Sequence, residues 1–321
     1  MKLGLQLPYF TYPGGPEAIA PTFGRIARDA EAAGFDSLWV MDHWFQIGGW
    51  GARELEMLEA YTALAYAAGV TRTIRLGALV TGVTYRHPGL LLKTVTTLDV
   101  LSGGRAYLGL GAAWNEQEHH GLGVPFPPLA ERYELLEDTL QLAQQMWSGE
   151  VRPFDGRRIH LAEALNSPPA LQRPHPPILI GGDGEKRTLP LVARYADACN
   201  IIIIPDRGAD YLRGAAYAQR KFAVLADLCA AAGRPYTEIE KTTLSALIVT
   251  PDGRRPEGTF QTREEQALLT PAQAVDYFGG LAAAGTDHAI FNAPNIHLPG
   301  AFDIWAADIV PAVHALVPAG R

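Results

Sequence analysis

Cysteine is scarce in this sequence, and so is positive charge. The 321 residues include two cysteines, Cys199 and Cys229, and carry a formal net charge of -7 at pH 7. Two cysteines exclude a disulfide framework, so we expect two buried free thiols in a cytoplasmic protein. An acidic chain lacks the basic surface that nucleic acids and anionic membranes attract. We therefore expect no nucleic-acid partner and no membrane partner.

Long apolar runs and lysines are also few. No apolar run approaches the ~18 residues of a membrane span. The stretch MKLGLQLPYF lacks the basic start and longer apolar core of a signal peptide. None of the lysines stands inside a predicted strand near its carboxyl end. A Schiff-base lysine of the aldolase kind is therefore not expected.

Short β-rich runs alternate with longer helical patterns along the chain. The pattern FGRIARDAEAAG, for example, spaces apolar residues by three and four and ends on Gly34. Several strands are apolar at successive positions, as parallel strands covered on both faces should be. This alternation predicts an α/β fold, a (β/α)8 TIM barrel. The eight predicted strands are residues 2–7, 36–41, 74–80, 105–111, 178–182, 197–203, 242–249 and 287–292.

A doubly wound parallel sheet is the alternative fold. Its best support is GLGAAW, residues 109–114, which starts like a dinucleotide-binding motif but lacks the third glycine. Such a motif also belongs after the first strand, whereas this stretch follows the fourth. The barrel therefore explains the pattern better.

Two stretches interrupt the alternation of strands and helices. Residues 150–177 are too rich in proline and polar residues for a barrel helix. We expect an insertion with a short hairpin there, between strands four and five. Residues 250–270 predict a mobile loop, since loops of this length are usually lids or disordered. No internal repeat is present. Because α/β barrels routinely occupy a chain of this length as one domain, we expect residues 1–321 to form a single domain.

The second predicted strand ends in an unusual pair, Asp42 and His43, followed by two aromatic residues. The carboxyl ends of the strands form the active-site rim of a barrel. Imidazole groups exchange protons near neutral pH, so His43 is a candidate acid–base catalyst. The alternative is a structural histidine bonded to a backbone carbonyl. Asp42 either orients His43 or caps the following segment.

The stretch GGDGEKRT after the fifth strand is typical of an anion site. Gly181, Gly182 and Gly184 allow backbone N–H groups to approach an oxyanion where the next helix starts. Lys186 and Arg187 are expected in the first turn of that helix, where the helix dipole disfavours cations unless an anion is bound. The stretch therefore predicts a phosphate site, with a plain turn carrying solvated charges as the alternative.

The stretch NEQEHH, residues 115–120, raises the question of a metal. Glu116 and His119 lie one helical turn apart, but the first strand offers no further ligand. We therefore expect no metal, and a metal-dependent hydrolase is the least favoured function.

Six stretches, in order along nearly the whole chain, resemble the bacterial luciferase-like superfamily. They are GLQLP, AGFDSLWVMDHW, IRLGALVTGVTYRHP, LSGGRAYLGLGAAWNEQEHHGLG, PHPPILIGGDGEKRTLPLVARYADACN and AGTDHAIFN. Within the superfamily they resemble the branch dependent on coenzyme F420, an 8-hydroxy-5-deazaflavin. The resemblance implies a barrel, a homodimer and a deazaflavin held at the rim.

The resemblance also implies roles for single residues. His43 corresponds to the family histidine beside the reactive ring, and Asp42 to its neighbour. Leu79 and Val80 correspond to a bulge, often with a non-proline cis peptide, behind the ring. Asn115 corresponds to a cofactor contact, and the glycines of GGDGEKRT correspond to the phosphate loop.

One departure from the family pattern leaves the substrate open. Sugar-phosphate dehydrogenases of the superfamily carry an acid where Ala112, Ala113 and Trp114 stand here. We expect an oxidoreductase that moves a hydride between F420 and a small organic substrate, with Lys186 and Arg187 suited to the anionic tail of the cofactor. The alternatives are an FMN-dependent monooxygenase of the same fold and a cofactor-binding protein without turnover.

Overall fold

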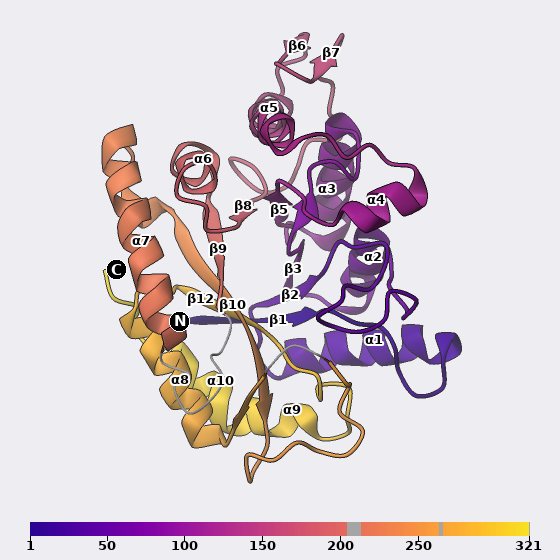
Figure 1. Cartoon of the computed structure of the whole chain (residues 1–321), viewed down its shortest axis with the longest axis vertical. Helices are drawn as coiled ribbons and strands as arrows, with labels where there is room; N and C mark the ends of the chain where they lie inside the picture. The colour runs from indigo at the N-terminus through magenta and orange to yellow at the C-terminus, as the bar shows by residue number, and fades with distance from the viewer. Residues whose placement is uncertain (204–212, 263–265, 321) are drawn as a thin grey trace.

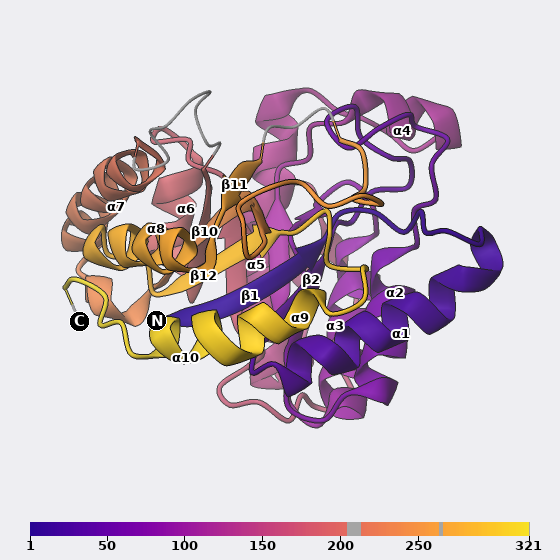
Figure 2. The same ribbon diagram turned by 90° about the horizontal axis from the view of Figure 1, so that it is seen from below.

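The computed structural model describes residues 1–203, 213–262 and 266–320, and its strands form a parallel barrel (Figures 1 and 2). The strand order is β3-β2-β1-β12-β10-β9-β8-β5-β4. A parallel bridge joins Leu76 of β3 to Ala106, two residues before β5, and so links the first strand of this order to the strand next to its last. The predicted (β/α)8 barrel is therefore confirmed. Its strands are β1 (Lys2–Leu7), β2 (Ser37–Val40), β3 (Arg75–Ala78), β4 (Thr81–Gly82), β5 (Leu108–Gly111), β8 (Ile178–Gly181), β9 (Ala198–Ile202), β10 (Glu240–Val249) and β12 (His288–Asn292).

The third predicted strand is divided into two short strands. β3 ends at Ala78 and β4 begins at Thr81, and the peptide bond between Leu79 and Val80 in the gap is cis. The cis peptide that the resemblance implied is therefore present. Both short strands keep parallel neighbours, β2 for β3 and β5 for β4. Together they occupy one strand position of the barrel.

Helices cover the outside of the strands (Figure 1). In α1 the buried residues include Ile19, Phe23, Ile26 and Ala30, which recur every three or four positions on one face. Gly34 follows that helix with a φ of 89°, a conformation that glycine adopts readily. The helices are α1 (Pro16–Ala32), α2 (Ala60–Val70), α3 (Pro88–Ser102), α4 (Glu116–Leu122), α5 (Leu129–Ser148), α6 (Thr188–Tyr195), α7 (Arg213–Ala232), α8 (Pro271–Ala283), α9 (Ala301–Ile304) and α10 (Val310–His314), with short η1 (Tyr236–Glu238) and η2 (Trp305–Ile309).

Residues 150–177 form the predicted insertion between the strands that hold positions four and five, β5 and β8. Strands β6 (Phe154–Asp155) and β7 (His160–Leu161) pair antiparallel in a hairpin, which projects at the top of Figure 1. The Asp138 carboxylate of α5 accepts the backbone N–H groups of Arg158, at 2.6 Å, and Ile159, at 3.1 Å. These bonds fasten the hairpin to the outer helix layer.

The stretch 250–270 reaches the open end of the barrel. Its short strand β11 (Ala267–Leu269) pairs parallel with β10. The Phe260 ring stacks on Tyr9 with centroids 4.0 Å apart, and the Thr262 hydroxyl donates to the Gly49 carbonyl at 2.7 Å. Residues 263–265 lie outside the described residues, and the mobility of the loop stays a prediction.

The amino ends of the strands are closed by large side chains and paired charges. The Trp39 indole lies over Gly77, where a Cβ atom would come within 2.4 Å of the ring. Lys241 and Asp287, each 1% exposed, form an ion pair of 2.8 Å. This end of the barrel is therefore a packed core. No helix among the described residues is both long and apolar enough to cross a membrane.

Candidate active site

A cavity of about 980 Å³ opens at the carboxyl ends of the strands. Its wall includes residues at or just after the ends of four strands: Gln6, His43, Gly111 and Asn292. The volume lies at the upper end of the roughly 300–1,000 Å³ typical of small-molecule sites. This is where catalytic groups of a (β/α)8 barrel are expected.

His43 lines the cavity and is held by a buried carboxylate. Its Nδ1 lies 2.7 Å from Oε1 of Glu118, which comes from α4 and is fully buried. The Tyr85 hydroxyl donates to the same oxygen, and the Trp44 backbone N–H donates to Oε2 at 2.7 Å. His43 is 9% exposed, and among the described residues no hydrogen bond reaches its Nε2.

The electrostatics of this cluster fix the tautomer of His43. Burial raises the pKa of Glu118, but the bonds from His43, Tyr85 and Trp44 outweigh it, so the pKa lies below its ordinary value. Burial, and then the Glu118 carboxylate, raise the pKa of Tyr85, which stays a neutral donor. An ionised Glu118 requires a proton on Nδ1 of His43. The lone pair of a neutral imidazole is then on Nε2, the nitrogen left for a ligand.

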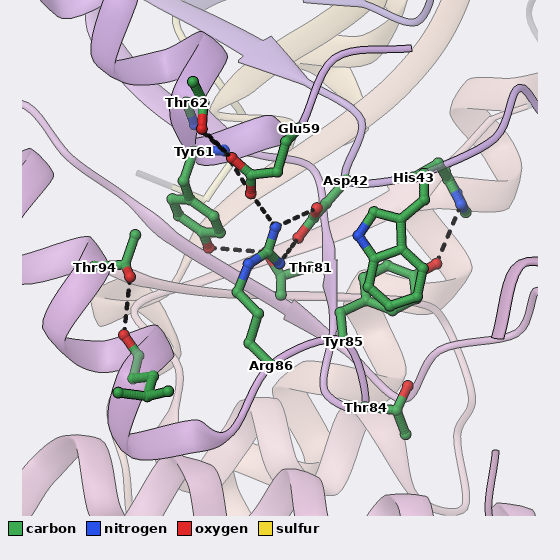
Figure 3. A network of polar contacts seen from close by, with 12 residues as sticks. Asp42, His43, Glu59, Tyr61, Thr62, Thr81, Thr84, Tyr85, Arg86 and Thr94 are labelled. Carbon is green, nitrogen blue, oxygen red and sulfur yellow. Dashed lines mark hydrogen bonds and ion pairs between the residues drawn. The ribbon is translucent and has the colours of Figure 1, made fainter. Parts of the chain in front are cut away.

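Asp42 does not orient His43. The carboxylate that orients His43 is Glu118. Both carboxylate oxygens of Asp42 accept from the Arg86 guanidinium, at 2.5 and 2.9 Å. Arg86 also binds Glu59, and Figure 3 shows it between the two carboxylates, beside the ring of Tyr61. The first of the two expected roles for Asp42 is therefore wrong. Asp42 ties the end of β2 to the starts of α2 and α3.

The bulge at Leu79 and Val80 faces the cavity, as both residues line it. The Gln6 amide donates to the Leu79 carbonyl at 2.7 Å. A Cβ atom on Gly111 or Gly181 would come within 2.9 Å of the Val80 side chain. The two glycines on the neighbouring strands therefore make room for Val80, and the bulge is supported from β1, β5 and β8.

Only part of the predicted phosphate loop lies at the cavity. Gly181 and Gly182 line the cavity, and Gly182 has a φ of 118°, which side chains rarely adopt. Gly184, Lys186 and Arg187 are exposed and do not line the cavity described here. The expectation that the two cations lie in the first turn of the helix is wrong. Helix α6 begins at Thr188, and both precede it in a turn.

Asn115 and His119 lie at the start of α4, beside the cavity. Asn115 is the N-terminal cap residue of that helix, half-buried, and its predicted contact with the cofactor stays a prediction. Both ring nitrogens of His119 are engaged, Nδ1 with the Asn115 carbonyl and Nε2 with the Thr84 hydroxyl, each at 2.6 Å. No group of three or more metal-ligating side chains is present in the part of the chain described.

Sequence reasoning missed the floor of the cavity. Asn292 is 4% exposed, lines the cavity and has no hydrogen-bond partner for its Oδ1 among the described residues. The amides of Gln6 and Asn200 line the same cavity. A buried, unpaired amide oxygen calls for a ligand or water that donates a hydrogen bond. The polar edge of a flavin-like ring meets that need. The signal in the sequence was an amide closing the apolar strand DHAIFN.

Glu118 was missed because its partner is 75 residues away in the sequence. The stretch EQEHH drew attention to metal binding through Glu116 and His119. Glu116 is exposed and lies 3.6 Å from His120 on the helix surface, whereas Glu118 faces the barrel. Which acid of a short helix faces inward depends on how the helix docks.

Comparisons with known proteins agree with this geometry. Residues 1–290 match the family model of the luciferase-like monooxygenases. An F420-dependent glucose-6-phosphate dehydrogenase from Kineococcus radiotolerans is 31% identical over 72% of this chain. The match spans 65% of that enzyme, just under two thirds of its length. An enzyme of the same description from Nakamurella multipartita is 31% identical over 82% of this chain and 74% of its own.

A solved structure carries the same fold across almost the whole length. The EDTA monooxygenase of a Chelativorans species superposes with a TM-score of 0.78. The match covers 99% of this chain and 95% of that one at 16% identity. The family model, the relatives and the barrel with its cavity at the carboxyl ends of the strands lead to one assignment. The chain belongs to the luciferase-like monooxygenase family.

Proposed function

We propose that this chain is an F420-dependent oxidoreductase that moves a hydride between the deazaflavin and a small organic substrate. The observation that carries the proposal is His43, which lines the cavity with Nδ1 bonded to buried Glu118 and Nε2 left for a ligand. The relatives that match much of the chain are described as F420-dependent dehydrogenases, which supports the choice of cofactor.

The chemistry divides between cofactor and protein. When bound, a deazaflavin supplies a ring carbon that accepts or gives a hydride. His43 supplies the accompanying proton transfer: its Nε2 takes the proton of a substrate hydroxyl, or returns one to a carbonyl oxygen. The proton on Nδ1 stays with the Glu118 contact, which fixes the ring orientation throughout. Burial of Glu118 and Tyr85 keeps water from replacing these bonds.

Several parts of the wall suit the cofactor. Val80 offers an apolar surface for a flat ring, and the amide of Asn292 offers an unpaired acceptor for a ring N–H. Gly182 lets the backbone approach a phosphate. We infer that Lys186 and Arg187, exposed in the turn beyond it, attract the anionic tail of the cofactor. The shorter FMN would reach fewer of these cations.

The proposal is tested by titrating the purified protein with F420 and with FMN. Intrinsic tryptophan fluorescence reports binding, because Trp50 and Trp114 line the cavity. We expect the dissociation constant of F420 to be the smaller of the two. An FMN dissociation constant tenfold below that of F420 would overturn the choice of cofactor. His43→Asn, which keeps a polar group of similar reach, is the control, and its F420 affinity should match that of the parent.

Other expectations accompany this proposal. We infer one domain over residues 1–321, a homodimer, a cytoplasmic location and no nucleic-acid partner. The acidic charge of -7 supports the last of these. Light scattering of the purified protein tests the homodimer, and a mass of one chain, 34.7 kDa, would contradict it.

A further inference from the structure

The cavity wall carries no lysine, arginine, aspartate or glutamate among the described residues. His43 and Tyr85 are the titratable groups on it, and its other polar side chains are the amides Gln6, Asn200 and Asn292 and the Ser245 hydroxyl. A substrate phosphate is normally bound by arginine or lysine. The described wall therefore offers a phosphorylated substrate no charged partner.

Two cations that adjoin residues of the described wall, Arg86 and Arg132, are already engaged. Arg86 is bound by Asp42 and Glu59. Arg132, which is 8% exposed, donates to the carbonyls of Ala112, at 3.1 Å, and Ala113, at 2.5 Å. Turning either guanidinium toward a substrate would break buried hydrogen bonds, so neither is available for recognition.

Trp114 stands at the mouth of the cavity with its indole unusually exposed. It is 64% exposed and lines the cavity, and its ring centroid lies 5.5 Å from that of His43 in an edge-to-face arrangement. Ala113, which precedes it, has a φ of 59°, and Arg132 holds the carbonyls of this turn. The conformation of this turn therefore places the Trp114 indole next to the His43 imidazole.

Ile202, at the end of β9, is exposed in a similar way, and β8 alone separates β9 from β5 in the strand order. It is 56% exposed and also lines the cavity, together with the buried Trp50 and Ile203. Exposed apolar groups that border a cavity mark a surface for an apolar ligand. Trp114, beside the proton-transfer group, and Ile202, elsewhere on the wall, thus offer the carbon skeleton of a substrate apolar contacts.

We propose that the substrate is an uncharged, largely apolar alcohol or carbonyl compound whose skeleton packs against Trp114 and whose oxygen faces His43. This inference rests on the proposed function. Oxidation of such an alcohol breaks its O–H bond, whose proton passes to Nε2 of His43. It also breaks one C–H bond, whose hydride passes to the oxidised deazaflavin, and a carbon–oxygen double bond forms. Reduction of the carbonyl compound reverses each of these changes.

The experiment compares two substrate classes with F420-loaded protein, following the absorbance of oxidised deazaflavin. The neutral class is 2-propanol, 2-hexanol and cyclohexanol, and the charged compound is glucose-6-phosphate. We expect kcat/KM for the best neutral alcohol to exceed that for glucose-6-phosphate by about tenfold or more, since a site discriminates through the groups it leaves unpaired. Among the neutral alcohols, 2-hexanol should have a lower KM than 2-propanol.

Trp114 variants test the apolar contact directly. We expect Trp114→Ala to raise KM for 2-hexanol about tenfold, the effect of removing an aromatic anchor worth about 1.4 kcal/mol, with a smaller change in kcat. Trp114→Phe should retain most of the affinity. Calorimetric titration of 2-hexanone into F420-loaded protein gives the same ranking without turnover. Leu101→Ala is the matched control, because Leu101 is 72% exposed at the end of α3, outside the cavity.

Three results would overturn the inference. They are faster turnover of glucose-6-phosphate than of every neutral alcohol, turnover of neither class by protein that binds F420, and an unchanged KM for 2-hexanol in Trp114→Ala. In all three the cofactor still binds, so the proposed function is judged separately by the F420 titration. Protein that fails to bind F420 overturns the proposed function and this inference with it.

Discussion

Two histidine–glutamate pairs lie at opposite ends of the barrel, and they differ in what surrounds them. At the amino end, His288 is 1% exposed, with Nε2 bonded to the Ser37 hydroxyl at 2.8 Å and Nδ1 3.5 Å from Glu240. At the carboxyl end, His43 binds Glu118 through Nδ1, and its Nε2 has no partner among the described residues. The same residue types therefore make a closed core contact at one end and an open site at the other.

The difference extends to the residues around each pair. Glu240 at the amino end also binds Lys2 at 2.8 Å and Tyr107 at 3.0 Å. A Cβ atom on Gly4 would come within 2.4 Å of the Ser37 hydroxyl, so the backbone packs tightly against this pair. The carboxyl end instead has a cavity of about 980 Å³ and an unpaired Asn292 oxygen. Buried groups packed against one another stabilise the fold, whereas an unpaired polar group that borders a cavity indicates binding.

The largest expected effect comes from breaking the open pair. His43→Asn removes the proton-transfer group, so we expect hydride transfer to fall ~10²–10⁴-fold while folding and F420 affinity persist. Single-turnover absorbance measurements give the rate, and thermal unfolding gives the stability. His288→Asn is the matched variant in the closed pair and should lower the melting temperature with little change in the rate per folded molecule. Equal loss of rate in both variants would erase the distinction between the two ends.

The next largest effect concerns the charges that close the amino end. Asp287→Ala leaves the Lys241 ammonium buried beside no carboxylate, which typically costs about 3–5 kcal/mol of unfolding free energy. Urea denaturation measures this loss. Arg53→Ala, which breaks the exposed ion pair with Glu54, serves as control and should cost below about 1 kcal/mol. A loss of similar size in both variants would mean that burial does not set the value of the Lys241–Asp287 pair.

The third prediction concerns Glu118→Gln, which changes the residue that holds His43 in the open site. Without the carboxylate, Nδ1 of His43 loses its acceptor of fixed charge, and the imidazole is free to change tautomer and orientation. We expect kcat to fall about 10²-fold, the scale of a small misplacement of a reacting group, with F420 affinity unchanged. The pH profile of kcat should shift as well, which a purely structural role would not cause. Glu116→Gln on the exposed face of α4 is the control and should match the parent.

Gly182→Ala has a smaller effect, on cofactor affinity. An alanine at a φ of 118° forces the backbone of the loop to move, at a cost of roughly 1–2 kcal/mol, or about tenfold in the F420 dissociation constant. Gly103→Ala is the matched control, because Gly103 has a φ of 75°, has no atom within 4 Å of an added Cβ and does not line the cavity. If both variants bind F420 as the parent does, the loop does not contact the phosphate.

The smallest effect is a pH-dependent difference in stability. The pKa of Glu118 is lowered from 4.5 in the folded protein, so this carboxylate stabilises the fold fully above about pH 4.5 and less as the pH falls. The difference in unfolding free energy between the parent and Glu118→Gln should therefore be constant at neutral pH and shrink below pH 4.5. Urea denaturation from pH 7 to pH 3 measures it. A gap that widens on acidification would contradict the lowered pKa.

Local sequence patterns were enough to predict much of the fold. Strand order along the chain, the helices between strands and the insertion at 150–177 follow from hydrophobic periodicity and from proline and glycine positions, which act over a few residues. The position of His43 at the cavity also follows, because a barrel places the carboxyl ends of all its strands at one rim. The position of Gly182 at the cavity follows for the same reason, because it comes directly after the carboxyl end of β8.

The sequence by itself determined the barrel and the residues that lie near its mouth, because periodicity and strand direction are local properties. The tertiary structure alone decided which side chains meet. In the folded chain His43 bonds to Glu118 rather than to its neighbour Asp42, and the Asp42 carboxylate binds Arg86 instead. Both residues follow β2, and each side chain is paired with a residue from far along the chain, 75 positions away for His43 and 44 for Asp42. The tertiary structure also left the Asn292 oxygen unpaired, which no short-range pattern encodes.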